Sequence, residues 1–261
     1  MQIDLAPSCL SRLLHLDNPH RDRLAAYFGA LDRTIRPPRN EIAYLFILFT
    51  NRCGSNYLAQ LLASTGRFNE AGEYFNAETV LHHARRHRLR ALPDYLDFLN
   101  RCVAMHGRLV VKLGIEHLAL LAEAGLLQAM LPRAHLVLIE REDRLGQAIS
   151  RAIACQNLRW TSRHQPALPD DQLRYSRSLI KLEWDKANLG NYLLRYVLGD
   201  LGVAACCTTY EDLLADPQAV IARIGAHVGE RGLQIAPSRV SIERQATSLN
   251  EAWRTWYLRG E

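Results

Sequence analysis

A polar segment at residues 50–56 carries the side chains of this sequence that are best suited to bind an anion. It follows an apolar run, precedes a helical pattern, and contains Arg52, Gly54, Ser55 and Asn56. Glycine lets the backbone approach a ligand closely, hydroxyl and amide groups donate hydrogen bonds, and a guanidinium group can grip two oxygens. The unpaired N–H groups at the start of a helix also attract an anion. We therefore predict an anion-binding loop, although an ordinary strand-to-helix turn explains the segment equally well on its own.

This loop differs from the phosphate loop of nucleoside-triphosphate enzymes. The motif of those enzymes places a lysine between the last glycine and the Ser or Thr, whereas Gly54 is followed directly by Ser55 and the loop contains no lysine. An ordinary ATPase or kinase is therefore disfavoured. A kinase-like nucleotide phosphotransferase and a non-catalytic nucleotide-binding protein stay open as alternative functions.

A second basic residue stands at the end of another apolar run. Arg141 follows residues 134–140, and Ser150 comes nine residues later on a predicted helix. About two and a half helical turns separate the two side chains, so they can share one phosphate only if Arg141 folds back along the helix. Otherwise Ser150 is a hydroxyl on the helix surface, and Arg141 forms an ion pair with a neighbouring acid, which is Glu140, Glu142 or Asp143.

Alternating strand and helix patterns determine where these residues lie. Apolar runs predict strands at 41–49, 108–114, 134–140 and 202–210. Helical patterns occupy 55–65, 77–92, 93–105, 115–131, 143–158, 172–198 and 216–229. This alternation favours a parallel sheet with helices on both faces, and the loops after its strands then meet at one edge. We predict one α/β domain over residues 1–261, with a helical insertion at 77–107 and a polar surface loop at 161–172.

The composition of the chain argues against several classes of protein. Its 261 residues are 48% hydrophobic, and its net charge of +5 forms no basic stripe, so we do not expect nucleic acid as a partner. No apolar run reaches the roughly 20 residues that span a bilayer, and the N-terminal residues lack the pattern of a secretory signal. We therefore expect a cytoplasmic protein with reduced thiols. Its six cysteines and ten histidines show no metal-ligand spacing, so we expect no metal.

Several motifs, taken together, resemble those of a known enzyme family. Arg-x-Gly-Ser follows a strand, Glu-Tyr-Phe follows the next helix, and Arg-x-Asp precedes Gln-Ala-x-Ser on a later helix. The chain is in this respect similar to the bacterial carbohydrate sulfotransferases typified by trehalose 2-sulfotransferase, which use 3′-phosphoadenosine 5′-phosphosulfate (PAPS) as donor. The resemblance implies a P-loop-like parallel sheet flanked by helices, and it covers the segments 50–75, 111–114, 140–150, 156–160, 208–217 and 243–257.

The resemblance also implies which residues bind the donor. The 5′-phosphosulfate loop would consist of Arg52, Gly54, Ser55 and Asn56. Asn56 departs from the family, which commonly has Thr at this position, but an amide can still donate to a phosphate oxygen. The 3′-phosphate would be held by Arg141 and Ser150, and a C-terminal element that closes over the nucleotide would contribute Arg244 and Gln245.

The remaining implied roles concern the reaction and the acceptor. Glu73 matches the family's catalytic glutamate, which takes the proton of the acceptor hydroxyl, and Glu70 matches an acid that contacts sugar hydroxyls. Two nearby carboxylates would raise the pKa of one of them. Arg52 and Lys112 are placed to stabilise charge on the transferred group, although Lys112 is equally well interpreted as a surface lysine. With Trp160 available to stack on a sugar, the resemblance implies a homodimeric sulfotransferase that modifies a carbohydrate or glycolipid.

Overall fold

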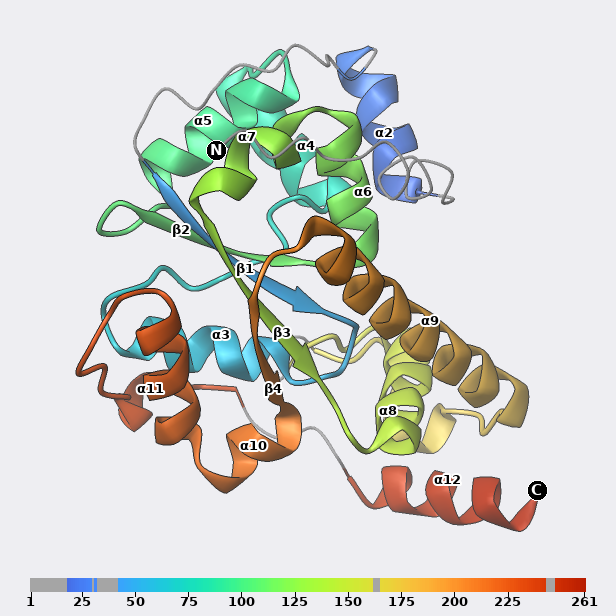
Figure 1. Cartoon of the computed structure of the whole chain (residues 1–261). Coiled ribbons are helices and arrows are strands. Elements are labelled where there is room, and N and C mark those ends of the chain that lie inside the picture. Colours follow the sequence, from blue (N-terminus) through green and yellow to red (C-terminus); the bar gives the residue numbers. More distant parts are fainter. Residues whose placement is uncertain (1–17, 30, 32–41, 162–164, 243–246) are drawn as a thin grey trace.

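The computed structural model describes residues 18–29, 31, 42–161, 165–242 and 247–261, and its centre is a four-stranded sheet (Figure 1). All strand pairs are parallel, in the order β2-β1-β3-β4. The strands are β1 (Ala43–Phe49), β2 (Arg108–Leu113), β3 (Ala134–Glu140) and β4 (Ala205–Thr209). The α/β class and the four predicted strands are therefore confirmed. Strand β4 begins later than predicted, because Gly202 ends the preceding helix with a φ of 59°.

Both faces of the sheet are covered by helices, which is why its strands read as continuous apolar runs. Along β1, Tyr44, Phe46 and Leu48 pack into one core, and the alternate residues Leu45, Ile47 and Phe49 pack into another. The first core also takes residues from α2 (Pro19–Phe28), α4 (Ala77–His87), α5 (Leu92–Cys102), α6 (Ile115–Glu123), α7 (Leu126–Met130) and α9 (Arg177–Leu201). The second takes residues from α3 (Ser55–Ser64), α10 (Tyr210–Ala215) and α11 (Pro217–His227).

A third core lies beyond the carboxyl ends of the strands. It joins α8 (Arg144–Asn157) and α9 to α12 (Ser248–Arg259), the helix drawn in red in Figure 1. Trp253 of α12 is 1% exposed there, so this tryptophan is a core residue. Short 3-10 turns complete the described structure at Leu131–Arg133, Asp170–Gln172 and Pro237–Arg239.

Several helical predictions need correction. The pattern at 115–131 forms two helices, α6 and α7, because Gly125 between them has a φ of 70° that breaks the α-helical path. Helices α2, α10 and α12 were not predicted from the sequence; α2 begins at Pro19 and is capped by Asn18. The predicted insertion at 77–107 forms α4 and α5, and α5 packs against β2, an edge strand of the sheet.

The described part of the chain has no membrane-spanning helix, no metal-binding cluster and no disulfide. No helix there is long and apolar enough to cross a membrane. Over the same residues there is no group of three or more His, Cys, Asp or Glu side chains that could hold a metal ion. The cysteines that are described are all free, namely Cys53, Cys102, Cys155, Cys206 and Cys207.

Candidate active site

A hollow that involves many of the predicted residues lies at the carboxyl ends of the strands. It is a cavity of about 1270 Å³ between the loop after β1, the turn after β2, the start of α8 and the start of α10. The chain leaves β1 toward β2 on one side, whereas β3 lies on the other side of β1. Connections that diverge in this way leave a crevice at the carboxyl edge of a parallel sheet, which is where α/β proteins bind ligands.

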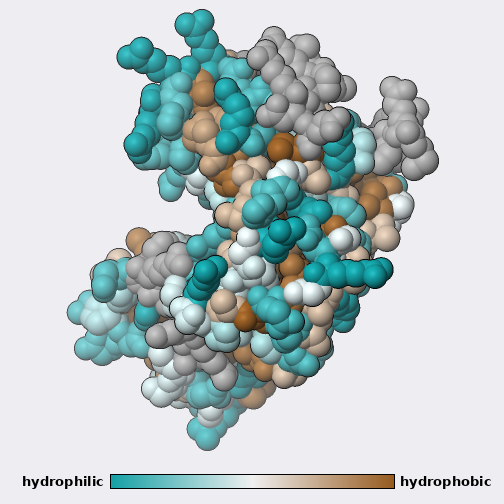
Figure 2. All heavy atoms as spheres, turned by 90° about the vertical axis from the view of Figure 1, so that its left-hand side faces the viewer, coloured by the Kyte–Doolittle hydropathy of each residue, from teal (hydrophilic) through white to brown (hydrophobic). Residues whose placement is uncertain are grey.

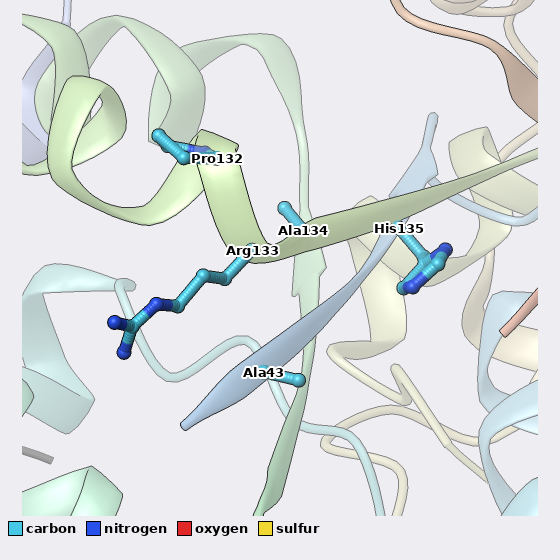
Figure 3. Close-up of a pocket in the computed structure, with 5 residues that line it drawn as sticks. All are labelled: Ala43, Pro132, Arg133, Ala134 and His135. Atoms are coloured by element: carbon cyan, nitrogen blue, oxygen red, sulfur yellow. The ribbon is translucent and has the colours of Figure 1, made fainter. Parts of the chain in front are cut away.

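A second hollow, of about 500 Å³, lies at the opposite, amino edge of the sheet. Figure 2 looks onto this side of the molecule, where hydrophobic atoms appear in small groups among hydrophilic ones. The hollow is lined by Ala43 and residues 132–135. The side chains of Arg133 and His135 leave the chain on the same side but extend away from one another (Figure 3), so they do not converge on the hollow. We therefore place the candidate site at the carboxyl edge.

The predicted anion loop has a backbone that positions its N–H groups toward the cavity. Gly54 is the N-cap of α3 with a φ of 89°, and no side chain caps the first turn of this helix. A Cβ at Gly54 would lie 2.4 Å from Cδ2 of Tyr210, so any other residue would collide with this ring. Arg52 also has a positive φ, 67°. The loop thus brings an uncapped helix N-terminus and a guanidinium group to the cavity wall, as an anion site requires.

Arg52 is held in place by residues far along the chain. Its Nε donates to Oγ of Ser150 at 2.9 Å, and its Nη1 donates to the carbonyl oxygen of Trp160 at 2.9 Å. Burial, together with the nearby positive charge of Arg141, lowers the pKa of Arg52 to about 10. The side chain is still protonated at neutral pH. The structure therefore brings Arg52, Ser150 and Arg141 together, although they come from two different strand ends.

Arg141 forms an ion pair with one of its three acidic neighbours and also lies against an aromatic ring. Its Nη2 is 3.3 Å from Oδ2 of Asp143, the residue that caps α8. Its Cζ lies 5.1 Å from the centre of the Tyr210 ring. Asp143 is shared with Arg254 of α12, which also donates to Oδ2. The Nε of Arg141 is buried and has no hydrogen-bond partner in the part of the chain that the structure describes, so a bound ligand oxygen would satisfy this donor.

Lys112 is buried, which corrects its interpretation as a surface lysine. The residue is 3% exposed, and its Nζ lies 5.0 Å from the centre of the Phe49 ring. The ammonium group donates to Oε1 of Glu73 at 3.2 Å and to Oδ1 of Asn56. It therefore ties the anion loop to the predicted catalytic glutamate.

Glu73 is positioned by its attachment to the sheet. The carbonyl oxygen of the preceding residue, Gly72, accepts a hydrogen bond from the backbone N–H of Lys112 at 2.9 Å. Burial raises the pKa of the Glu73 carboxyl, but the charge and hydrogen bond of Lys112 outweigh burial, so this pKa lies below its usual value. The expected rise in pKa from a second carboxylate is thus wrong for Glu73. The carboxylate is ionised at neutral pH, as a proton acceptor must be.

Glu70 lies apart from this group. Its Oε1 accepts a hydrogen bond from Gln60 at 3.2 Å, and it is not among the residues that line the cavity. Arg244 and Gln245 lie outside the described residues, so their placement beside the nucleotide stays a prediction.

The comparison with protein families decides the class of the protein. The sequence model of the Stf0 sulphotransferase family matches residues 107–260, which is more than half of the chain. The chain belongs to the Stf0 sulphotransferase family. It is a sulfotransferase, and the predicted resemblance is confirmed. The match begins after the anion loop and Glu73, so their roles depend on the geometry described above and on the motifs of the sequence.

Solved structures similar to this sulfotransferase are distant in sequence. A sulfotransferase from Alicyclobacillus acidocaldarius is 16% identical, with a TM-score of 0.46, over 87% of this chain and 93% of that one. A retinol dehydratase with retinol and PAP is 16% identical, with a TM-score of 0.39, over 84% and 67%. A retinol dehydratase with androsterone and PAP is 15% identical, with a TM-score of 0.38, over 92% and 70%. No curated protein matches the chain.

The wall of the sulfotransferase cavity formed by α8 and α9 carries Trp160 together with charged residues. The Cζ of Arg151 lies 4.9 Å from the centre of the Trp160 ring. Arg151 also donates from Nε to Oε2 of the buried Glu183 at 3.1 Å. One face of the tryptophan is thus occupied by a cation, and a stacking role for Trp160 toward a sugar stays a prediction.

Sequence reasoning missed several residues of the sulfotransferase cavity. Gln147 supports the anion loop, because its Nε2 donates to Oγ1 of Thr50 at 2.9 Å and to the carbonyl oxygen of Asn51 at 2.8 Å. Tyr210 directly follows β4, so the rule that singled out Arg141 after β3 could have found it. His117 had no such signal, because its neighbours come from other elements.

Proposed function

We propose that this sulfotransferase moves a sulfuryl group from PAPS to a hydroxyl of a carbohydrate or glycolipid. One observation supports this most: Arg52, Arg141 and the start of α3 line the same crevice, and the buried Lys112 holds the carboxylate of Glu73, which lines it too. Such a site offers guanidinium groups and helix N–H groups to a polyanionic donor and an ionised carboxylate to the acceptor.

The residues present fit the two anionic ends of PAPS. The open N–H groups of α3 and the side chain of Asn56 suit the 5′-phosphosulfate. Arg141 has an unpartnered Nε for the 3′-phosphate. Ser150 accepts from Arg52 through its oxygen, so its O–H is left to donate to the same phosphate. Burial first and then the charge of Arg141 lower the pKa of Arg52, and a bound polyanion would offset the repulsion between the two guanidinium groups.

When bound, PAPS would supply an activated sulfuryl group, because the bisphosphate that leaves is stable. The protein has to hold the acceptor oxygen in line with the sulfur–oxygen bond that breaks, and to stabilise charge on the surrounding oxygens. Lys112 and Arg52 provide that charge. As the new sulfur–oxygen bond forms, Glu73 takes the proton of the acceptor hydroxyl. The electron pair of the broken bond stays on the 5′-phosphate oxygen.

The acceptor side of the cavity is polar around Glu73. His20, Asn76 and Glu116 line the cavity on this side, together with Tyr74. Several donors and acceptors in one wall suit a polyhydroxylated ligand, because each buried polar group needs a partner. This supports the carbohydrate class that the sequence resemblance implies. The homodimer, the cytoplasmic location and the closing role of Arg244 and Gln245 stay predictions from the sequence.

A thermal-shift experiment tests the donor half of this proposal. Adenosine 3′,5′-bisphosphate (PAP) is compared with ATP plus magnesium, because ATP lacks a 3′-phosphate. We expect PAP alone to raise the melting temperature, by mass action on the folded state. The Arg52→Ala variant should keep its fold and lose most of this shift. Stabilisation by ATP with magnesium alone would favour the kinase-like alternative, and stabilisation by neither would favour a protein without this catalytic site.

A further inference from the structure

His117 lies at the acceptor side of the cavity, in the first turn of α6. The residue is 4% exposed. Its Nδ1 accepts a hydrogen bond from the backbone N–H of Gly114, the N-cap of the helix, at 3.0 Å. His117 and Glu73, the proposed catalytic carboxylate, line the same cavity. The ring is therefore fixed at one nitrogen by the helix that it caps.

The hydrogen bond to Gly114 determines the protonation state of the ring. Since Nδ1 accepts, the proton of a neutral imidazole is on Nε2. Burial lowers the pKa of His117 to about 4, against the opposing charge of Glu73, so the ring is neutral at physiological pH. His117 thus presents an N–H donor at Nε2 and cannot take a proton there.

The Nε2 donor is buried and has no hydrogen-bond partner among the described residues, although His117 is among the residues that line the cavity. Unpaired buried donors are rare in native proteins, because they lose their hydrogen bonds to water and gain none. The ring of His20 stacks on His117, with centroids 4.9 Å apart and an angle of 16° between the planes. This stacking covers a face of the ring and leaves its edge as the place where a partner can bind.

Helix α2 holds His20 against His117. The side-chain amide of Asn18 donates to the carbonyl oxygen of Glu116 at 2.8 Å, which joins the start of α2 to the start of α6. The Nδ1 of His20 accepts from the backbone N–H of Ala77 at 3.3 Å. Three helix starts thus fix the position of the His117 ring, so its free donor has a defined place in the cavity wall.

We infer that His117 donates a hydrogen bond from Nε2 to an oxygen of the acceptor, next to the hydroxyl that gives its proton to Glu73. The inference rests on the proposed function. It assigns to the acceptor a second oxygen beside the reacting hydroxyl, which a sugar has and a simple alcohol lacks. Glu73 accepts a hydrogen bond and His117 donates one, so together they orient a polyhydroxylated ligand.

Two substitutions separate the structural bond of His117 from its free donor. In His117→Asn the amide oxygen takes the place of Nδ1 and can accept from Gly114, as Asn250 at the same helix position of α12 accepts from the N–H of Thr247 at 2.9 Å. The Nε2 donor is lost. In His117→Gln the side-chain amide reaches the place of Nε2 and keeps a donor there. His135→Asn, at the amino edge of the sheet, is the control for the loss of a histidine elsewhere.

The experiment measures PAP release with PAPS as donor and glucose, trehalose, maltose or lactose as acceptor. For the best acceptor we expect His117→Asn to raise the acceptor KM about 5- to 20-fold. The PAPS KM, the affinity for PAP and the melting temperature at neutral pH should stay unchanged. His117→Gln should lie between this variant and the wild type, and His135→Asn should equal the wild type. We also expect one deoxy analogue of the acceptor to be a poorer substrate than the parent sugar for the wild type. For His117→Asn this analogue and the parent sugar should be equally good substrates.

Other outcomes overturn the inference. If His117→Asn has the acceptor KM of the wild type, no acceptor oxygen binds Nε2, and the proposed function stands without this residue. If the variant weakens PAP binding or unfolds at lower temperature, His117 has a structural role instead. If the wild type binds PAP but transfers to none of the four sugars, the carbohydrate acceptor is wrong, and the inference falls with it.

Discussion

At the scale of single residues, the carboxylate of Glu73 is the group on which the proposed reaction depends most. Its bond to Lys112 keeps it ionised and fixes its position. In Glu73→Gln the amide cannot take a proton, so we expect kcat to fall about 100- to 10,000-fold, while the affinity for PAP by calorimetry stays within twofold of the wild type. Glu70→Gln, outside the cavity lining, is the matched control and should keep most of its activity. Equal activity of Glu73→Gln and the wild type would remove the general base from the proposal.

The same residue pair predicts how activity depends on pH. The pKa of Glu73 lies below its usual value, because Lys112 outweighs the effect of burial. The base is lost only when the pH falls through this lowered pKa, so the acidic limb of kcat/KM should lie below pH 4.5, the ordinary value for a glutamate. Lys112→Met removes the opposing charge but keeps the burial, so its acidic limb should move to higher pH.

A lysine other than Lys112 gives the control for this pH profile. Lys186 lines the same cavity, and its Nζ is bonded to Glu183 at 3.0 Å, away from Glu73. Lys186→Met therefore removes a positive charge from the cavity without changing the neighbours of the base. Its acidic limb should match that of the wild type. If the acidic limb of kcat/KM moves equally in Lys112→Met and Lys186→Met, the ionisation of Glu73 does not determine this limb.

At the scale of elements, the anion loop depends on the close approach of α10 to the start of α3. Gly54→Ala combines an unfavourable φ with a Cβ 2.4 Å from the Tyr210 ring. We expect a loss of about 1–3 kcal/mol in the free energy of unfolding and a large loss of PAP affinity. Gly107→Ala is the matched control, because its φ is 75° but its Cβ would meet no atom within 4 Å. If both variants lose the same stability and bind PAP equally well, the contact with Tyr210 has no role in the loop.

The first turn of α6 predicts a change of stability with pH. The folded pKa of His117 is about 4, below the ordinary 6.5, because of burial, while Glu73 opposes this and His20 and Lys112 add to it. His117 therefore binds a proton less readily in the folded state than in the unfolded chain. The free energy of unfolding falls as the pH drops from about 6.5 toward 4. His117→Asn lacks this group, so its melting temperature should fall less than that of the wild type over the same interval. An identical fall would show that other groups account for the acid sensitivity.

At the scale of the whole molecule, the sheet was predictable and several contacts of the site were not. The residues of β1 and β3 are buried on both faces of the sheet, which produces the apolar runs that revealed these strands. The place of Arg52 and Arg141 at the carboxyl edge could be predicted, because each residue comes just after a predicted strand. The burial of Lys112 could not be predicted, because it depends on Phe49 and Glu73, which come from other segments. Partners that meet only through the fold, such as Ser150 with Arg52, leave no pattern at any fixed spacing.

The break between α6 and α7 shows the same limit at the level of the backbone. A glycine inside a helical pattern is tolerated at a modest cost, so the sequence at 115–131 also suits one continuous helix. Gly125 ends α6 only because the chain must turn there before the short α7 and β3. Tertiary packing determines such turns, so the local sequence pattern could not predict that 115–131 forms two helices.

The single ammonium group shared by Asn56 and Glu73 links two events in the proposed reaction. Before transfer, part of the charge of Lys112 is neutralised by the glutamate. Once Glu73 has received a proton it becomes a weaker partner, because hydrogen bonds to a neutral carboxyl are weaker than those to a carboxylate. The ammonium of Lys112 can then interact more strongly with the 5′-phosphate oxygen of the donor, which gains negative charge as its bond to sulfur breaks. Deprotonation of the acceptor and departure of the leaving group thereby become cooperative.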